Sequence, residues 1–165
     1  MKFQGFTDAD WVGSPSNRKS TSRGIFNLGS ATVSWYNRKQ RSVALSLVEV
    51  EYMAASQAAC EAIWMKKILV GLFGQRMDPN VIYCDNQSCI KLSENPVFHD
   101  RSKHIDIWYH HLRECVVKRI MLLLYVSTEE QDANILTKAL SKCKFEFHRD
   151  RIGMTDNPFL VEMEC

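Results

Sequence analysis

Residues 46–73 predict a single long helix, and this helix constrains the fold more than any other feature of the sequence. Ser46 is a suitable N-cap, and Glu49 three positions later completes a capping-box pattern. Gly71 and Gly74 mark where the helix should end. The apolar stripe of so long a helix is expected to cover the face of a sheet.

Strand-forming runs precede the helix. Residues 3–8 predict a short strand that ends on an acid. Residues 24–28 and 31–36 are rich in strand formers, and Gly29-Ser30 between them is a two-residue hairpin signal. The stretch between the first two strands is polar and rich in turn formers, so we expect a loop there.

Strands and helices alternate after the long helix. The predicted elements are a strand at 80–84, a short helix at 86–94, a helix at 102–119, a fully buried strand at 120–126, a helix from Ser127 or Thr128 to about residue 140, and a helical piece at 142–152. The 102–119 helix carries an apolar stripe made of Ile105, Trp108, Leu112, Cys115 and Val116. This order predicts an α/β fold with a mixed sheet flanked by helices over residues 1–152, followed by a tail at 153–165.

The bulk composition is that of an ordinary globular domain. The chain has 165 residues, of which 45% are hydrophobic and 24% charged, and this length suits one domain. The formal net charge of +2 is too small to diagnose a nucleic-acid binder. The distribution of charge is more informative, because residues 18–23 and 38–41 are basic clusters.

The cysteines form no Cys-x-x-Cys pair, and several lie inside apolar runs. This pattern favours reduced thiols over a disulfide framework and argues against a zinc site. We find neither a signal peptide nor a membrane span in the sequence. We therefore expect a chain of the cytoplasm or the nucleus, or a piece of a longer one, with no membrane partner.

Three acids occupy unusual positions: Asp8 and Asp85 end predicted strands, and Glu51 interrupts the apolar stripe of the long helix. Ligand sites in open α/β sheets lie outside the carboxyl ends of strands, so Asp8 and Asp85 would meet if their strands are neighbours. A lone buried charge such as Glu51 is costly unless a cation relieves it. Glu49 lies about 200° round the helix from Glu51, so we expect it to point to solvent, and we assign it to capping.

Three converging carboxylates suit a hard divalent cation such as Mg²⁺. Two such ions about 3.5–4 Å apart would suit phosphodiester hydrolysis. Each acid also has an ordinary explanation, because strand-end aspartates often cap turns and helix glutamates often pair with basic side chains. The spacing alone therefore leaves a structural role open for each acid.

The motifs of the chain, taken together and in order, resemble the ribonuclease H domain of copia-type retrotransposon polyproteins. The matching stretches are TDADWVG, RKSTSRGIFNLGSATVSW, RKQRSVALSLVEVEYMA, IYCDNQSCIKL, NPVFHDRSKHIDIWYHHLRE and ANILTKAL. The resemblance runs from about residue 5 to 152, which is nearly the whole chain.

The resemblance implies a ribonuclease H-like fold with a five-stranded mixed sheet. It also implies metal-dependent cleavage of the RNA strand of RNA–DNA hybrids during reverse transcription. The cofactor would be two Mg²⁺ ions, for which Mn²⁺ can substitute, and the reverse transcriptase part of the same polyprotein would be a partner. The family's first three acids fall on Asp8, Glu51 and Asp85.

Two positions depart from the family pattern. Asn134 occupies the place of the fourth acid, while Asp132 replaces an apolar residue, and the two would point in different directions on a helix. A neutral amide oxygen is a weaker cation ligand than a carboxylate. We expect Asn134 to belong to the site and Asp132 to lie outside it. Arg23 stands where the family has a glycine, and either a disturbed strand register or a phosphate contact could result.

A hybrid-binding surface should offer mainly phosphate contacts. The candidate contacts are the basic and polar residues Arg18, Lys19, Ser20, Thr21, Arg38, Lys39 and Arg41, with Asn86, Gln87 and Lys103 from later helix starts. A solvated loop or a helix cap is the alternative explanation for each. At the level of the whole chain, a catalytically inactive nucleic-acid-binding or structural remnant of a polyprotein is the alternative to an active nuclease.

Overall fold

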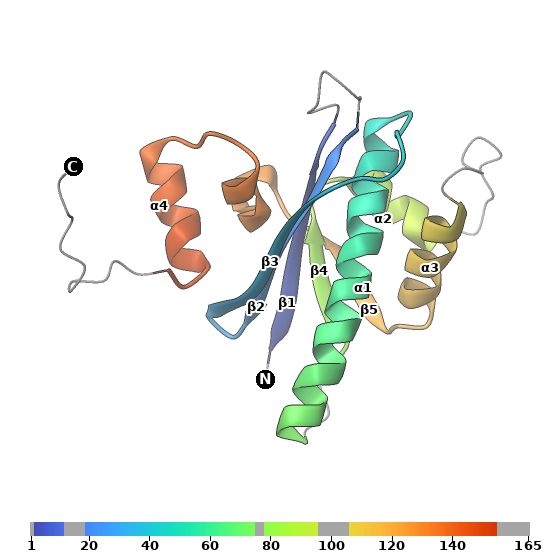
Figure 1. The fold of residues 1–165 in the computed structure, drawn as a ribbon, viewed down its shortest axis with the longest axis horizontal. Helices are drawn as coiled ribbons and strands as arrows, with labels where there is room; N and C mark the ends of the chain where they lie inside the picture. The colour runs from blue at the N-terminus through green and yellow to red at the C-terminus, as the bar shows by residue number, and fades with distance from the viewer. Residues whose placement is uncertain (1, 12–18, 75–77, 96–105, 155–165) are drawn as a thin grey trace.

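A five-stranded mixed sheet runs through the centre of the structure, in the strand order β3-β2-β1-β4-β5 (Figure 1). The strands are β1 (Phe3–Asp10), β2 (Thr21–Leu28), β3 (Ala31–Lys39), β4 (Asn80–Cys84) and β5 (Met121–Tyr125). The computed structural model describes residues 2–11, 19–74, 78–95 and 106–154, without the side chains of 106–109.

The first three strands form an antiparallel meander, as the sequence predicts. Gly29 adopts a φ of 66° in the turn between β2 and β3, a conformation that glycine reaches without strain. β1 then pairs with β4 in parallel, and β4 pairs with β5 in parallel. The parallel pairing brings the carboxyl ends of β1 and β4 to the same edge of the sheet.

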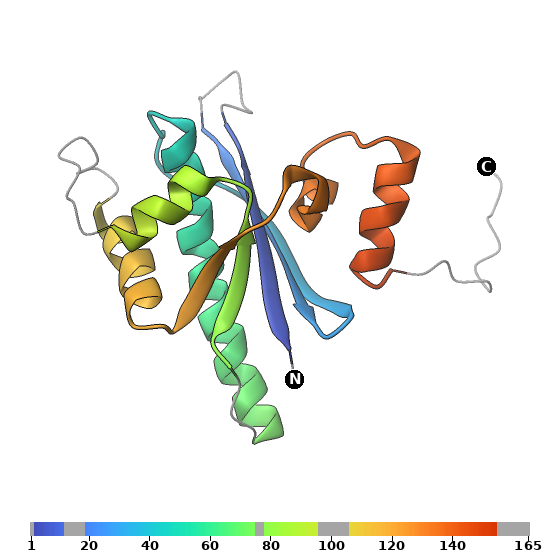
Figure 2. The same ribbon diagram turned by 180° about the vertical axis from the view of Figure 1, so that it is seen from behind.

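Helices cover the sheet on both faces (Figures 1 and 2). The helices α1 (Leu47–Phe73), α2 (Gln87–Glu94) and α3 (Asp106–Val117) lie on one side, and α4 (Lys142–Arg151) lies on the other. The hydroxyl of Ser46 accepts a hydrogen bond from the amide of Glu49, and Gly74 ends α1 at a φ of 64°. The predicted long helix is therefore confirmed with both of its end signals. Glu49 does not point to solvent as predicted: it is 7% exposed, and its Oε2 accepts a hydrogen bond of 2.7 Å from the amide of Leu45.

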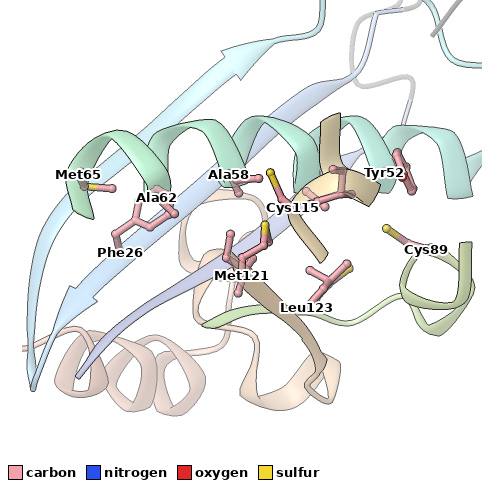
Figure 3. Close-up of a cluster of buried hydrophobic side chains, with 14 of the residues drawn as sticks. Phe26, Tyr52, Ala58, Ala62, Met65, Cys89, Cys115, Met121 and Leu123 are labelled. Carbon is pink, nitrogen blue, oxygen red and sulfur yellow. The ribbon is translucent and has the colours of Figure 1, made fainter. Parts of the chain in front are cut away.

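Alanines make the face of α1 that meets the sheet, which lets the helix lie close to the strands. The buried cluster under α1 includes Ala58, Ala62, Met65, Phe26 and Tyr52 (Figure 3). Leu112 and Cys115 of α3 join it, as the predicted stripe requires. The other predicted members of that stripe in the 102–109 region lie outside the described side chains. Among the described residues, no helix has the length and apolar character needed to cross a membrane.

Two local predictions are wrong. The strand predicted as fully buried is the edge strand β5, where Leu122 and Leu124 are 39% and 42% exposed. The helix predicted over about 128–140 is replaced by two short 3₁₀ segments, η2 (Thr128–Glu130) and η3 (Asp132–Leu136). Gln131 lies between them and donates a hydrogen bond of 2.8 Å to the carbonyl of Thr7. This contact holds the segment around Gln131 against β1, whereas a continuous α-helix would direct the same residues away from the strand.

Candidate acidic active site

Asp8 and Asp85 lie side by side at the end of the sheet where the carboxyl ends of β1 and β4 meet. Phe6 and Tyr83 are partners in the parallel β1–β4 register, and their rings stack at a centroid distance of 5.0 Å. Asp8 and Asp85 follow this pair by two residues on each strand, so both acids belong to the same face of the sheet. The predicted meeting of Asp8 and Asp85 therefore occurs, although β1 continues two residues past Asp8 and Asp85 directly follows β4.

Glu51 reaches this edge from α1. The side chain is only 4% exposed, and the backbone amide of Ala9 hydrogen bonds to the carboxylate. Burial raises the pKa of Glu51 well above its ordinary value of 4.5, and the nearby Cys84, Asp8 and Asp85 raise the pKa further. The predicted apolar surroundings of Glu51 are present, since Ala54, Ala55 and Ala58 are fully buried.

The buried carboxylates leave oxygens without a hydrogen-bond partner. Among the described residues, neither Asp8 Oδ2 nor Glu51 Oε2 has one. Burial raises the pKa of Asp8 above its ordinary value of 3.8; the ammonium of Lys138 opposes this rise, and repulsion from Asp85 adds to it. Partnerless buried carboxylate oxygens are costly in a folded protein. The donor set of Asp8, Glu51 and Asp85 therefore fits a hard divalent cation.

Cys84 is a neighbour of the acids that sequence reasoning missed. Ligand atoms of Glu51, Cys84 and Asp85 all lie within 4.8 Å of one another. Strand alternation places Cys84 on the opposite face of β4 from Asp85, so nothing in the strand pattern joins the two. The position of Glu51 is the signal that could have revealed the group of Glu51, Cys84 and Asp85. Its carboxylate lies at the end of β4, close to side chains from both faces of that strand.

Asn134 connects the last segment to the acids through a chain of hydrogen bonds. Its Nδ2 donates to the carbonyl of Thr128 at 2.7 Å, and the hydroxyl of Thr128 donates to Asp85 Oδ2 at 3.0 Å. On the other side, Asn134 Oδ1 accepts from Lys138 Nζ at 3.2 Å. These partners fix the orientation of the amide, because a cation must face the oxygen and a carbonyl must face the NH₂ group.

Asp132 is directed towards α4 and away from this chain of bonds. The carboxylate is 1% exposed, and its Oδ1 lies 2.8 Å from His148 Nδ1 and 3.2 Å from Arg151 Nε. Burial raises the pKa of Asp132, while the hydrogen bond from His148 and the charge of Arg151 lower it. The structure thus gives Asp132 a place in the anchor between η3 and α4.

Arg23 lies opposite Asp8 in the β1–β2 ladder. The β1–β2 pairing runs without interruption from Phe3 with Leu28 to Asp10 with Thr21. The β2–β3 pairing is regular at Arg23 with Asn37, and its one printed register shift lies further along β2, between Phe26 and Asn27. The side chain of Arg23 is mostly buried, and its Nη2 lies 3.9 Å from Asp10 Oδ2. Its Nε and Nη1 have no partner among the described residues. The phosphate contact remains a prediction.

Basic residues at the end of β3 and just after it line a cavity beside α1. Its volume is about 280 Å³, and its walls are Ser22, Arg38, Lys39, Gln40, Arg41, Met53, Gln57, Cys60 and Glu61. Arg38 Nη1 lies 2.7 Å from Glu61 Oε1, which holds the guanidinium at the rim. The cavity therefore gathers three of the predicted phosphate contacts into one groove.

The other predicted contacts are dispersed. Ser20 is 1% exposed, while Lys19 and Thr21 are half-buried. Asn86 caps α2 by accepting a hydrogen bond from the amide of Cys89 at 2.9 Å, and Gln87 is exposed in the first turn of that helix. Arg18 and Lys103 lie outside the described residues.

Sequence comparison relates the chain to transposon polyproteins, although no protein-family model matches it. The chain is 42% identical, over 94% of its length, to the retrovirus-related Pol polyprotein from transposon TNT 1-94 of Nicotiana tabacum. It is 38% identical, over 96% of its length, to the Pol polyprotein from transposon RE1 of Arabidopsis thaliana. The chain spans only 12% and 11% of these relatives.

Solved structures with little sequence identity share the fold. LC11-RNase H1, isolated from compost, is 14% identical and superposes with a TM-score of 0.60 over 82% of this chain and 91% of its own. The same protein in complex with an RNA/DNA hybrid is matched with a TM-score of 0.52, at 12% identity over 79% of this chain and 88% of its own.

Part of a viral protease-reverse transcriptase shares the fold. The prototype foamy virus protease-reverse transcriptase is 11% identical and is matched with a TM-score of 0.51 over 93% of this chain and 21% of its own. The structural likenesses establish a ribonuclease H-like fold, and the sequence relatives place that fold within transposon polyproteins. The chain therefore belongs to the ribonuclease H-like domains of copia-type retrotransposon Pol polyproteins.

Proposed function

We propose that this domain is a metal-dependent endonuclease that cleaves the RNA strand of RNA–DNA hybrids during reverse transcription. The observation that carries this proposal is the proximity of Asp8, Glu51 and Asp85. Ligand atoms of Glu51 and Asp85 lie within 4.8 Å of each other, and Asp8 lies close enough to both for their charges to interact. Asp8 Oδ2 and Glu51 Oε2 are buried and lack partners among the described residues. The complex of a fold relative with an RNA/DNA hybrid supports the choice of substrate.

Asp8, Glu51 and Asp85 would hold the divalent cations, which we propose to be two Mg²⁺ ions with Mn²⁺ as a substitute. When bound, such ions supply an activated water and stabilise the leaving oxygen of a phosphodiester. The chain itself orients Asp85 through the hydroxyl of Thr128 and places the ammonium of Lys138 beside Asp8 and Asn134. This ammonium offsets part of the negative charge of the acids.

The basic groove supplies the contact with the nucleic-acid backbone in this proposal. Arg38, Lys39 and Arg41 line it, and cationic side chains along a groove bind phosphates independently of base sequence. The reverse transcriptase part of the same polyprotein is the proposed protein partner, and the foamy virus protease-reverse transcriptase supports this choice. We propose that the reaction takes place inside the cell.

The test is cleavage of a labelled RNA–DNA hybrid in Mg²⁺ and in Mn²⁺ by the wild-type chain and by Asp85→Asn, with Asn134→Asp alongside. The exposed acid Asp78 provides the matched control Asp78→Asn. We expect the wild type and the control to cut and Asp85→Asn to be inactive. Equal cleavage by the wild type and Asp85→Asn would contradict the proposal.

A catalytically inactive hybrid-binding domain is the second candidate, and Asn134 is the observation in its favour. Its amide oxygen already accepts from Lys138, so position 134 offers no free carboxylate to a second ion. If only Asn134→Asp cuts, the natural domain is a disabled nuclease. If no variant cuts while the hybrid still binds, the binding-domain function is supported.

A further inference from the structure

We propose that Glu51, Cys84, Asp85 and Cys89 form a mixed thiolate–carboxylate site for a thiophilic divalent cation such as Zn²⁺ or Cd²⁺. This site would share Glu51 and Asp85 with the acidic site and would add two sulfur ligands. It goes beyond the proposed nuclease function, because it needs neither a nucleic acid nor cleavage activity.

The geometry of the first three ligands carries the proposal. Ligand atoms of Glu51, Cys84 and Asp85 lie within 4.8 Å of one another, a spacing that a single ion can bridge after small side-chain rotations. Cys84 is fully buried, and Glu51 is 4% exposed. Glu51 Oε2 has no hydrogen-bond partner among the described residues, so one buried ligand atom is available.

Cys89 supplies a second sulfur from the first turn of α2. The side chain of Cys89 lies beside that of Cys84, and both are fully buried. Asn86 fixes the position of Cys89 by accepting a hydrogen bond from its amide at 2.9 Å. Cys89 is not among the ligand atoms that lie within 4.8 Å of one another, so it would complete the four donors of a tetrahedral zinc-type site after its side chain turns towards Glu51 and Asp85.

The chemistry of the donors separates this site from a magnesium site. Mg²⁺ requires oxygen ligands in octahedral geometry and does not use thiolates. Zn²⁺ and Cd²⁺ accept thiolate and carboxylate together in tetrahedral geometry. Because Glu51 and Asp85 serve both ions, a bound thiophilic ion would exclude Mg²⁺ from the acids.

A second thiol group on the molecule must be controlled. Cys60 Sγ lies 3.7 Å from His111 Nδ1, and Cys115 Sγ lies 3.8 Å from His111 Nε2. The measurement therefore uses the full-length reduced chain with Cys60→Ser, Cys143→Ser and Cys165→Ser as the background. In this background Cys115→Ser is the matched control, because Cys115 is a buried thiol outside the proposed site.

The experiment is a titration of the background chain with Cd²⁺, followed by the ultraviolet charge-transfer absorption of cadmium–thiolate bonds. We expect saturation at about one ion per chain, loss of most of the absorption in Cys84→Ser, a loss of about half in Cys89→Ala, and no change in Cys115→Ser. Retention of the full absorption in Cys84→Ser, or its loss in Cys115→Ser, would overturn the proposal.

Two further measurements keep the test decisive if a buried cysteine variant does not fold. Glu51→Gln retains both sulfurs and should weaken Cd²⁺ binding about tenfold or more. Excess Mg²⁺ should raise the apparent dissociation constant of Cd²⁺ in the background chain. Indifference of Cd²⁺ binding to both Glu51→Gln and Mg²⁺ would show that the metal binds elsewhere. None of these readouts uses cleavage, so they stand apart from the nuclease test.

Discussion

Arg23 and Asp8 are directly paired residues of the antiparallel β1–β2 ladder, and their side chains share one face of the sheet. The charge of Arg23 lowers the pKa of Asp8 against the effect of burial. A cation is thus built into the strand next to the first acid of the site. We expect Arg23 to weaken the binding of metal ions at the site and to strengthen the binding of phosphates.

Replacing this cation should therefore separate metal binding from hybrid binding. In Arg23→Gln we expect Mg²⁺ to bind roughly three- to tenfold more tightly, because a positive charge near the ion is removed. We expect the hybrid to bind more weakly, because a phosphate contact is lost. Calorimetry gives the first quantity and fluorescence anisotropy the second. If the affinities for Mg²⁺ and for the hybrid both fall, Arg23 contributes only to the stability of the fold.

Glu51→Gln should make the metal-free protein more stable at neutral and alkaline pH. Because the pKa of Glu51 is raised in the folded state, the folded chain keeps a proton that the unfolded chain loses above about 4.5. The free energy of unfolding therefore falls as pH rises from 4.5 towards the folded-state pKa. Glutamine carries no such penalty. Thermal unfolding in the presence of a chelator should show that Glu51→Gln is more stable than the wild type, and that this difference in stability increases from pH 5 to pH 8. A difference that decreases over this range would contradict the prediction.

Mg²⁺ should raise the thermal stability of the wild type and leave Asp85→Asn almost unchanged. An ion that binds only the folded state adds about 2.7 kcal/mol at a concentration of one hundred times its dissociation constant. Asp85 belongs to the group of ligand atoms at the site, while the exposed Asp78 does not. Calorimetric scans with and without Mg²⁺ check the prediction, with Asp78→Asn as the variant that should respond like the wild type.

Asn134→Asp should destabilise the metal-free protein by about 1–2 kcal/mol. The substitution places a carboxylate oxygen where Asn134 Nδ2 now donates to the Thr128 carbonyl at 2.7 Å. The new carboxylate would gain an ion pair with Lys138, so combining Asn134→Asp with Lys138→Met should cost more than the sum of the two changes. Chemical denaturation of the four proteins gives this double-mutant cycle, and additivity would show that Lys138 does not respond to residue 134.

Asp132→Ala should cost about 3–5 kcal/mol of unfolding free energy. The substitution leaves His148 and Arg151 facing a buried space without their carboxylate partner. The affinity of the folded protein for Mg²⁺ should not change, because Asp132 is directed towards α4. Denaturation and metal titration of the same sample check both statements. A stable variant with weakened metal binding would place Asp132 in the site instead.

The sequence predicts those parts of the fold that carry local signals. Ser46, Glu49 and Gly74 define α1, and Gly29-Ser30 defines the hairpin, because capping and turn chemistry act between close neighbours. The convergence of Asp8 and Asp85 follows from strand ends once β1 and β4 are neighbours. The cation-binding role of these acids stays a prediction.

Tertiary contacts explain what the sequence could not predict. The α-helix predicted after Ser127 is replaced by 3₁₀ segments, because the side chain of Gln131 binds the backbone of β1 instead of projecting from a helix surface. The exposure of β5 depends on its place at the edge of the sheet, which its own residues do not encode. Cys84 was missed because strand alternation separates it from Asp85, while Glu51 brings the two together.

The hydrogen bond from Gln131 to Thr7 also has a consequence for the order of events during folding. It joins residues that are 124 positions apart in the chain, so it forms only after nearly the whole domain has been synthesised. Contacts between distant residues are slow to form. The three acids are complete once residue 85 has emerged from the ribosome, whereas Lys138 follows much later. A nascent chain would thus pass through a stage in which the carboxylates repel one another without the ammonium of Lys138, and free Mg²⁺ would favour folding most at that stage.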